Sequence, residues 1–280
     1  MVAADVTPAG RLIYDAFKDV AGRHAFPPAF PSLETASRVV GFFLGLASMH
    51  CLVAEHDGQV VGAIFLDEGD EIRAVGLIGV DPMVQRRGIG RQLMEAGLAR
   101  ARGAAGVRLV QEAFNTHAMG LYAALGFEVK EPLARVVGRP TAPVPSGVEI
   151  RPLRASDLEA CAGLCRRVHG ITRTVDLQDA LTHFRTFAVL RGGRLVAYTY
   201  EVFRGILAWG VAESEADLHA LLAGAARTLD LPLAFLLPTR QTSFFRWCLA
   251  EGFRIEKPLT LMAMGQYQEP RGPWFPSGFY

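Results

Sequence analysis

Residues 80–94 read Val-Asp-Pro-Met-Val-Gln-Arg-Arg-Gly-Ile-Gly-Arg-Gln-Leu-Met, and this stretch decides how the rest of the chain is interpreted. An apolar strand is followed by the Asp81-Pro82 turn, and a loop with Gly88 and Gly90 leads directly into a helix. Glycine lets the backbone approach a ligand closely. The free backbone N–H groups at the start of the helix and the neighbouring arginines predict a site for an anion such as a pyrophosphate.

Two common phosphate-binding loops do not fit this stretch. A dinucleotide-binding loop needs three glycines in G-x-G-x-x-G, but the third position is Leu93. A P-loop needs Gly-Lys-Ser or Gly-Lys-Thr, which is absent. On the residues alone, an ordinary strand–turn–helix with solvated arginines stays an alternative.

Two motifs in the first half of the chain resemble those of the GNAT superfamily of N-acetyltransferases. Gln85-x-x-Gly88-x-Gly90 after Val-Asp-Pro is similar to motif A, Q/R-x-x-G-x-G/A. Residues 115–127 match the pattern N-x-x-A-x-x-L-Y-x-x-x-G-F at every named position. The resemblance is to the tandem, two-domain bacterial type, and it implies an α/β (α+β) fold in which each unit is a mixed, mostly antiparallel sheet flanked by helices.

The resemblance also implies roles for individual residues. Acetyl-CoA is the implied cosubstrate, and no metal is implied. The expected contacts with it are made by Ile78, Val80, Gln85, Arg86, Arg87, Gly88, Ile89, Gly90, Arg91 and Asn115. The implied catalytic residue is Tyr122, which lies near the sulfur.

The chemistry of acyl transfer fits these roles. A neutral amine attacks the thioester, and the developing oxyanion needs a preorganised donor, for which the backbone N–H of Val80 is suited. The Tyr122 hydroxyl can donate a proton to the departing thiolate as a general acid. Without the motif, Tyr122 would be interpreted as an aromatic packing residue.

The general base is left open by the sequence. Residues 74–80 contain no carboxylate, so a familiar position for the base in this superfamily is empty. The candidates are His117 and three acids in the turn after the second strand, Asp67, Glu68 and Glu71. An exposed acidic turn is often only a solvated turn, and proton loss through ordered water is a further alternative.

The chain of 280 residues divides into two similar parts. The proline-rich stretch 139–147 reads as a linker between residues 1–139, the predicted catalytic domain, and residues 148–280. The two parts can be laid on each other at a hairpin turn, at a strand and at a Gly-Phe pair. The matched segments are 57–62 with 192–197, 78–80 with 209–211, and 125–127 with 251–253.

The second part lacks the predicted cofactor site. The segment 212–218 has no glycine and no arginine, and it has three acids, which would repel a pyrophosphate. Counting back from the Gly-Phe pair puts Cys248 in the place of Tyr122 and Gln241 in the place of Asn115. We therefore expect a degenerate unit that serves structure, substrate binding or dimerisation, and a homodimer stays open.

Composition excludes several classes of function. The net charge of +1, with acids and bases interspersed, gives no basis for binding nucleic acid or an anionic membrane. No signal peptide or membrane-spanning stretch is visible, so we expect a cytoplasmic protein. The four scattered cysteines indicate core-facing thiols rather than a disulfide framework or a zinc site.

The sequence therefore predicts acyl transfer, chiefly acetyl transfer, from acetyl-CoA to a primary amine of a small molecule or protein. The alternatives are a non-catalytic acyl-CoA-binding sensor or scaffold, and O-acyl transfer. Residues 271–280 carry four aromatic side chains in a proline-rich tail. We expect this tail to pack on the first domain or on a second subunit and to help shape the acceptor pocket, the alternative being a frayed chain end.

Overall fold

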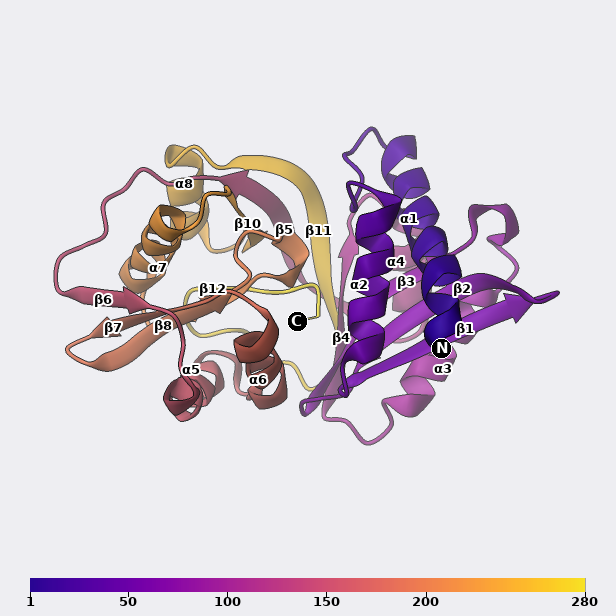
Figure 1. The fold of residues 1–280 in the computed structure, drawn as a ribbon, viewed down its shortest axis with the longest axis horizontal. Coiled ribbons are helices and arrows are strands. Elements are labelled where there is room, and N and C mark those ends of the chain that lie inside the picture. The colour runs from indigo at the N-terminus through magenta and orange to yellow at the C-terminus, as the bar shows by residue number, and fades with distance from the viewer. Residues whose placement is uncertain (280) are drawn as a thin grey trace.

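The computed structural model describes residues 1–279, which form two sheets flanked by helices (Figure 1). We call residues 1–139 the first half and residues 148–279 the second half. The first half contains α1 (Val6–Arg23), α2 (Leu33–Gly45), β1 (Met49–His56), β2 (Gln59–Asp67), β3 (Ile72–Val80), α3 (Ile89–Arg100), β4 (Gly106–Glu112), α4 (Thr116–Ala124) and β5 (Glu128–Gly138). The second half contains β6 (Val148–Arg151), α5 (Leu158–His169), α6 (Thr174–His183), β7 (Thr186–Arg191), β8 (Arg194–Tyr200), β9 (Trp209–Ala212), α7 (Glu215–Thr228), β10 (Leu233–Pro238), α8 (Thr242–Ala250), β11 (Arg254–Gly265) and β12 (Trp274–Phe275).

The larger sheet is mixed and mostly antiparallel, as predicted for both, whereas every strand pair of the smaller sheet among the described residues is antiparallel. The larger sheet has the strand order β1-β2-β3-β4-β11-β5-β10, and the smaller one has the order β12-β9-β8-β7-β6. Within residues 1–279, β3 and β4 form the one parallel pair. Two-residue turns, Asp57-Gly58 and Gly192-Gly193, join β1 to β2 and β7 to β8 with positive φ at both positions, which hairpins of this type require.

Strand β11 joins the two halves into one sheet. It comes from the second half in sequence but lies between β4 and β5 of the first, where Leu259 pairs with both Glu112 and Leu133. In exchange, β5 pairs with β10 of the second half (Figure 1). The division into residues 1–139 and 148–280 therefore describes a repeat in the sequence. The larger sheet pairs strands from both sides of this division.

Helices cover both faces of the first half's strands. Helices α1 and α2 lie on one face and α3 and α4 on the other (Figure 1). Successive side chains of β2 alternate between these layers: Phe65 belongs to the core with Ile13 of α1, whereas Ile64 belongs to the core with Met94 of α3. Both layers are apolar, which explains why residues 60–66 read as a continuous hydrophobic run.

The strand register corrects one detail of the predicted repeat. The backbone N–H of Asp81 donates to the Val61 carbonyl at 3.0 Å, and that of Glu213 donates to the Val196 carbonyl at 2.8 Å. Glu213 is therefore the counterpart of Asp81, so Ala212 is the counterpart of Val80. The match of residues 78–80 with 209–211 was wrong by one position, because two short apolar strands contain nothing that fixes their register in sequence.

The aromatic tail packs on the protein, which confirms that part of the prediction. Trp274 and Phe275 form β12 and are almost fully buried. Phe279 is 8% exposed and meets Phe43 of the first half, with ring centroids 4.8 Å apart. Burying each such ring is worth roughly 1.5–3 kcal/mol. Tyr280, also part of the predicted tail, lies outside the described residues.

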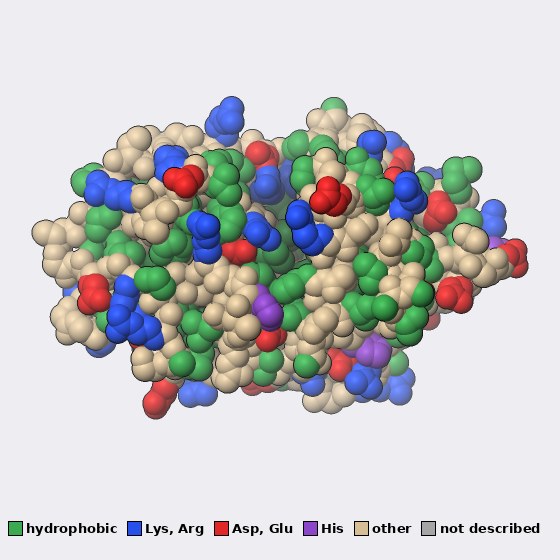
Figure 2. Space-filling model, viewed as in Figure 1, with side chains coloured by type: hydrophobic (Ala, Val, Ile, Leu, Met, Phe, Trp, Pro, Cys, Tyr) green, Lys and Arg blue, Asp and Glu red, His purple; other side chains and the backbone are tan. Residues whose placement is uncertain are grey.

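The four cysteines are buried and free, as expected of core-facing thiols. No helix within residues 1–279 has both the length and the apolar character needed to cross a membrane. Acidic and basic side chains are interspersed over the face shown in Figure 2, and several basic ones surround the hollow between the halves.

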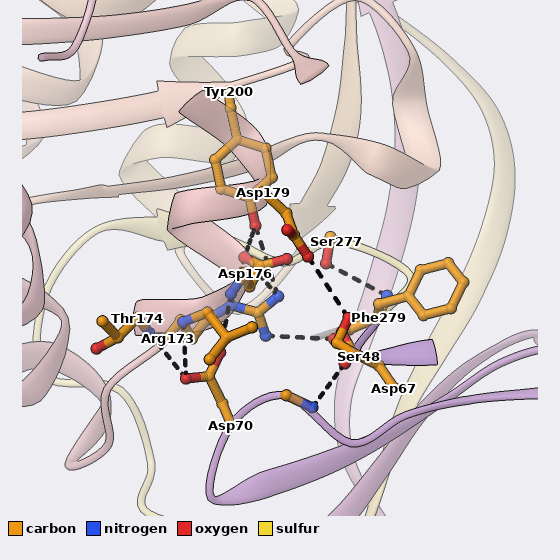
Figure 3. Close-up of polar contacts among 12 residues, drawn as sticks. Ser48, Asp67, Asp70, Arg173, Thr174, Asp176, Asp179, Tyr200, Ser277 and Phe279 are labelled. Atoms are coloured by element: carbon orange, nitrogen blue, oxygen red, sulfur yellow. Dashed lines mark hydrogen bonds and ion pairs between the residues drawn. The ribbon is translucent and has the colours of Figure 1, made fainter. Parts of the chain in front are cut away.

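The first half caps a helix of the second half. Helix α6 receives no side-chain hydrogen bond from its own N-cap residue, Arg173. Instead, the Asp70 carboxylate accepts hydrogen bonds from the backbone N–H groups of Thr174, Val175 and Asp176 at 2.8, 3.1 and 3.1 Å (Figure 3). These groups would otherwise lack partners at the start of a helix. The carboxylate therefore links the halves by a cap in trans.

Replacing Asp70 by Ala should lower the free energy of unfolding by about 1–2 kcal/mol, the usual cost of losing a helix cap. Urea unfolding followed by circular dichroism measures the change. Asp230→Ala, at an exposed position, is the matched control and should change stability by less than about 0.5 kcal/mol. Equal effects of the two substitutions would show that the cap does not link the halves.

Candidate functional site

Strands β3 and β4 pair at one end and separate at the other. Their parallel pairing runs from Ile72 with Gly106 to Val75 with Leu109. We call the remaining segments, residues 76–80 of β3 and 110–112 of β4, the first fork. None of the described residues pairs with this edge of β3, whereas its other edge stays paired with β2. An extended ligand can therefore add to β3 here as a strand would.

The backbone N–H of Val80 points into the first fork. The adjacent residue, Asp81, donates its backbone N–H to Val61 of β2. Because successive backbone groups of a strand alternate between its two edges, the N–H of Val80 is directed to the opposite edge. This is the donor that the sequence analysis assigned to the oxyanion.

Hydrogen bonds within the loop after β3 hold it in shape. The Asp81 side chain accepts from the backbone N–H of Met83 at 2.9 Å, and Gln85 Nε2 donates to the Val80 carbonyl at 3.2 Å. Gln85, predicted as a cofactor contact, thus also has a structural role. Arg86 has φ of 65°, and both it and Arg87 are exposed.

The two glycines of the loop are required for different reasons. Gly88, the N-cap of α3, has φ of 83°, and this left-handed conformation favours glycine. Gly90 has no such constraint, and a Cβ there would make only ordinary contacts of 3.7 Å with Leu121 and Val80. The described residues therefore do not themselves demand glycine at position 90.

The N-terminus of α3 is suited to an anion. The backbone N–H groups of residues 88–91, which include the predicted contacts Ile89 and Arg91, have no partners within the helix. Gly88 provides no side-chain cap. The Arg91 side chain is exposed and lies 3.7 Å from Glu95. The positive end of the helix dipole and three exposed arginines favour a pyrophosphate at this position.

The corresponding helix of the second half is capped by its own residues. Ser214 Oγ accepts from the backbone N–H of Asp217 at 3.2 Å at the start of α7. The Asp217 carboxylate, which is almost fully buried, pairs with Arg191 at 2.8 Å. The start of α7 thus holds a carboxylate at the helix position that Arg91 has in α3.

Asn115 and Tyr122 lie on α4, beside β4. The Asn115 side chain caps α4 by accepting from the backbone N–H of Ala118 at 3.2 Å. Tyr122 is 6% exposed and packs with Phe127 in the core beneath α3 and α4. Burial raises the pKa of the Tyr122 phenol well above its ordinary value. The hydroxyl therefore stays protonated at neutral pH and can act as a donor.

The acidic turn is too far from Val80 to supply a base beside that donor. Asp67 pairs with Ala74, six residues before Val80 along β3, which corresponds to about 20 Å. Glu68 pairs with Arg100 at 2.7 Å, and Glu71 accepts from the backbone of the second half (Figure 3 shows Asp67 and the acids around it). Of the predicted base candidates, His117 remains, exposed in the first turn of α4.

Several residues near the fork were missed by the sequence analysis. Phe26, from the turn between α1 and α2, stacks on Phe114 at 4.4 Å between ring centroids. Glu112, at the end of β4, forms a buried ion pair with Lys257 of β11. A surface hollow of about 530 Å³ is lined by Asp15, Lys18, Asp19, Gly22, Arg23 and Pro82. Lys257 gave no signal in the sequence, because it stands in the mostly charged stretch 254–257.

Comparison with known proteins gives a family for the first half. Residues 47–129 match the family model of the acetyltransferase (GNAT) domain. A mycothiol acetyltransferase of Nocardia farcinica is 38% identical over 119 residues, which cover 39% of this chain and 34% of that protein. The chain thus spans about a third of the length of the curated relatives it matches, or less.

Solved structures show the same fold over nearly the whole chain. A proposed acetyltransferase of Pyrococcus horikoshii superposes with a TM-score of 0.77 at 19% identity, covering 97% of this chain and 89% of that one. A tandem GNAT protein from the clavulanic acid biosynthesis pathway gives a TM-score of 0.57 at 15% identity, covering 95% and 97%. At these identities the likeness concerns the fold alone.

The Asp67 carboxyl should make stability depend on pH. Burial and, to a smaller extent, repulsion by Asp176 raise its pKa from 3.8 to about 6. Between these values the folded state holds a proton that the unfolded state has lost, so the contribution of this group to stability falls as the pH rises from 4 to 6. The slope is at most about 1.4 kcal/mol per pH unit.

Asp67→Asn should remove this contribution, because the amide does not titrate and its oxygen can still accept from Gly69. Urea unfolding of both proteins at pH 4, 5, 6 and 7 gives the difference in unfolding free energy. The wild type should lose stability relative to the variant as the pH rises through this window. A constant difference across the four pH values would contradict the assignment.

Proposed function

We propose that the protein transfers an acyl group, chiefly acetyl, from acyl-CoA to a primary amine, because residues 47–129 match the model of the GNAT acetyltransferase domain. The observation that carries the proposal is the combination of an unpaired edge of β3 with an uncapped helix at the end of the same strand. The edge suits an amide-containing arm, and the helix start suits a pyrophosphate. Acyl-CoA has both groups.

In this proposal the first half holds the cosubstrate through its backbone. Ile78 and Val80 bond the pantetheine arm, and the backbone of residues 85–91 holds the pyrophosphate. Asn115 caps α4 next to the arm, so its position is fixed by the helix it begins. The second half, with a carboxylate at its matching helix, binds no acyl-CoA and acts in structure or acceptor binding.

The proposed chemistry uses two donors. The N–H of Val80 stabilises the oxyanion that forms when the amine attacks the thioester. Tyr122 donates to the thiolate as it leaves, since a phenol is protonated at neutral pH. The proton of the amine passes to ordered water or to His117. The hollow beside Pro82 and the Phe26–Phe114 stack are the proposed walls of the acceptor side.

A non-catalytic acyl-CoA sensor is the rival function, and the absence of a carboxylate from residues 74–80 favours it. Release of free CoA from acetyl-CoA in the presence of a panel of amines separates the two. The panel should include the acceptor of mycothiol acetyltransferases, since the matched relatives carry that name. Tight binding of acetyl-CoA without turnover of any amine would favour the sensor.

Gly90→Asp should abolish acetyl-CoA binding without harming the fold. The new Cβ makes ordinary contacts, and an acid in the first turn of a helix is stabilising, so the melting temperature should hold or rise. The carboxylate would occupy and repel the phosphate position. Titration calorimetry should show one site per chain in the wild type and at least 100-fold weaker binding in the variant.

The matched control is Ala216→Asp, at the same position of α7 in the second half. It should leave acetyl-CoA affinity unchanged. Two sites per chain in the wild type, or loss of binding in the control, would contradict the assignment of the site to the first half.

Tyr122→Phe should lower kcat by about 10²–10⁴-fold, the usual worth of general acid assistance, and leave acetyl-CoA affinity nearly unchanged. The phenyl ring still fills the core, so the fold should persist. Steady-state kinetics with the best amine of the panel measures the effect. Tyr198→Phe removes another buried hydroxyl, in the second half, and should leave kcat unchanged. An unchanged kcat in Tyr122→Phe would assign Tyr122 to packing.

A further inference from the structure

The second half has a fork of its own, which matches the first residue by residue. Ala212 is the counterpart of Val80, as the register shows. Gln241 is the counterpart of Asn115: each is the N-cap of its helix, with φ and ψ of −82° and 71° at Asn115 and −75° and 73° at Gln241. We call the space between β9, β10 and the start of α8 the second fork.

The chain's own tail lies in the second fork. Strand β12 pairs antiparallel with β9, Trp274 with Val211 and Phe275 with Gly210. On its other side Phe275 packs against Phe235 of β10, with ring centroids 4.7 Å apart. The tail therefore separates β9 from β10, where the first half leaves the edge of β3 unpaired.

The tail accepts from the donor that corresponds to Val80. The backbone N–H of Ala212 donates to the Pro273 carbonyl at 3.0 Å. In the proposed function, the N–H of Val80 faces the carbonyl of the thioester. The same strand position thus faces a carbonyl group in both halves.

Gln241 binds the tail's backbone with both ends of its side-chain amide. Its Nε2 donates to the Trp274 carbonyl at 2.7 Å, and its Oε1 accepts from the Trp274 backbone N–H at 3.2 Å. A pantetheine arm also carries secondary amides, so the group recognised is chemically the same. Asn115, one methylene shorter, caps its own helix instead.

We propose that residues 273–275 occupy the second half's former acyl-CoA arm site, and that Gln241 and Ala212 have become a clamp that holds the tail in place of the cofactor. The assignment of the fork as an arm site rests on the proposed function. The clamp consists of contacts within this chain, so it can be tested without acyl transfer.

The clamped tail delivers an aromatic ring to the first half. Beyond β12 the chain reaches Phe279, whose ring lies directly against Gly76 of β3, where a Cβ would overlap it. The Phe279 carbonyl accepts from Arg173 at 3.2 Å (Figure 3). Gly76 precedes Val80 by four residues on the same strand. The clamp therefore positions the Phe279 ring on the face of β3 that α1 and α2 cover, which is the proposed acceptor side.

Gln241→Ala tests the clamp by hydrogen–deuterium exchange of the full-length protein. The backbone amides of Trp274, Phe275 and residues 277–279 should exchange at least tenfold faster, while those of β7 and β8 stay protected. Acetyl-CoA affinity should be unchanged, and acceptor KM should rise more than kcat falls. Gln241→Glu keeps the acceptor for the Trp274 N–H and loses the donor, so it should give an intermediate rate.

Gln268→Ala is the matched control, because this glutamine bonds the Val168 carbonyl and not residues 273–275. Unchanged protection of the tail in Gln241→Ala would overturn the proposal, and so would equal release in Gln268→Ala. Should the protein bind no acyl-CoA at all, the proposed function fails while the exchange result still decides whether the clamp exists.

Discussion

The insertion of β11 between β4 and β5 is the constraint on which the other features depend. Without β11, the outer edge of β4 would lose its hydrogen-bond partners, and β5 would have no sheet of its own half to join. The exchange makes each half necessary for the other's sheet. It also brings Lys257 beside Glu112, so that a charge pair, rather than an apolar contact, is buried where the halves meet. Pairing of strands so distant in sequence makes folding slow in comparison with local contacts.

The two halves show how one backbone arrangement can serve two purposes. Each has a strand whose edge faces the start of a helix, α4 in the first half and α8 in the second. The N-cap residue of that helix has an amide side chain in both halves. In the first half the start of a second helix, α3, has no side-chain cap and lies among arginines. In the second half Ser214 and Asp217 occupy the start of the matching helix, α7, and β12 pairs with β9. In the proposed function, a few side chains at the helix start, and not the fold, separate a site for a ligand from a site for the tail.

The acidic turn illustrates how local sequence can mislead about function. Acids in a turn near a predicted cofactor strand suggest a base, yet Asp70 and Glu71 hold the second half, and Glu68 pairs with Arg100. The carboxylates of Asp70 and Glu71 satisfy backbone N–H groups of the second half, whereas Glu68 pairs with a guanidinium of its own half. Their position at the far end of β3 follows from the register of β2 and β3, which no pattern within the turn records.

The sequence alone determined the elements and the glycine–arginine loop after β3, because both depend on local rules. Hairpin glycines, the alternation of apolar residues and the glycine–arginine loop are set by the conformations that individual residues allow. The sequence also predicted that the aromatic tail packs on the protein, since exposed aromatic rings are unfavourable in water. Only the tertiary structure decided where the tail goes, that Gln241 holds it, and that β11 changes sheets. The position of the tail and of β11 depends on backbone hydrogen bonds between segments far apart in the chain, and such bonds carry no side-chain signature in the sequence. The role of Gln241 depends on which distant backbone its side chain reaches, which the residue type alone does not show.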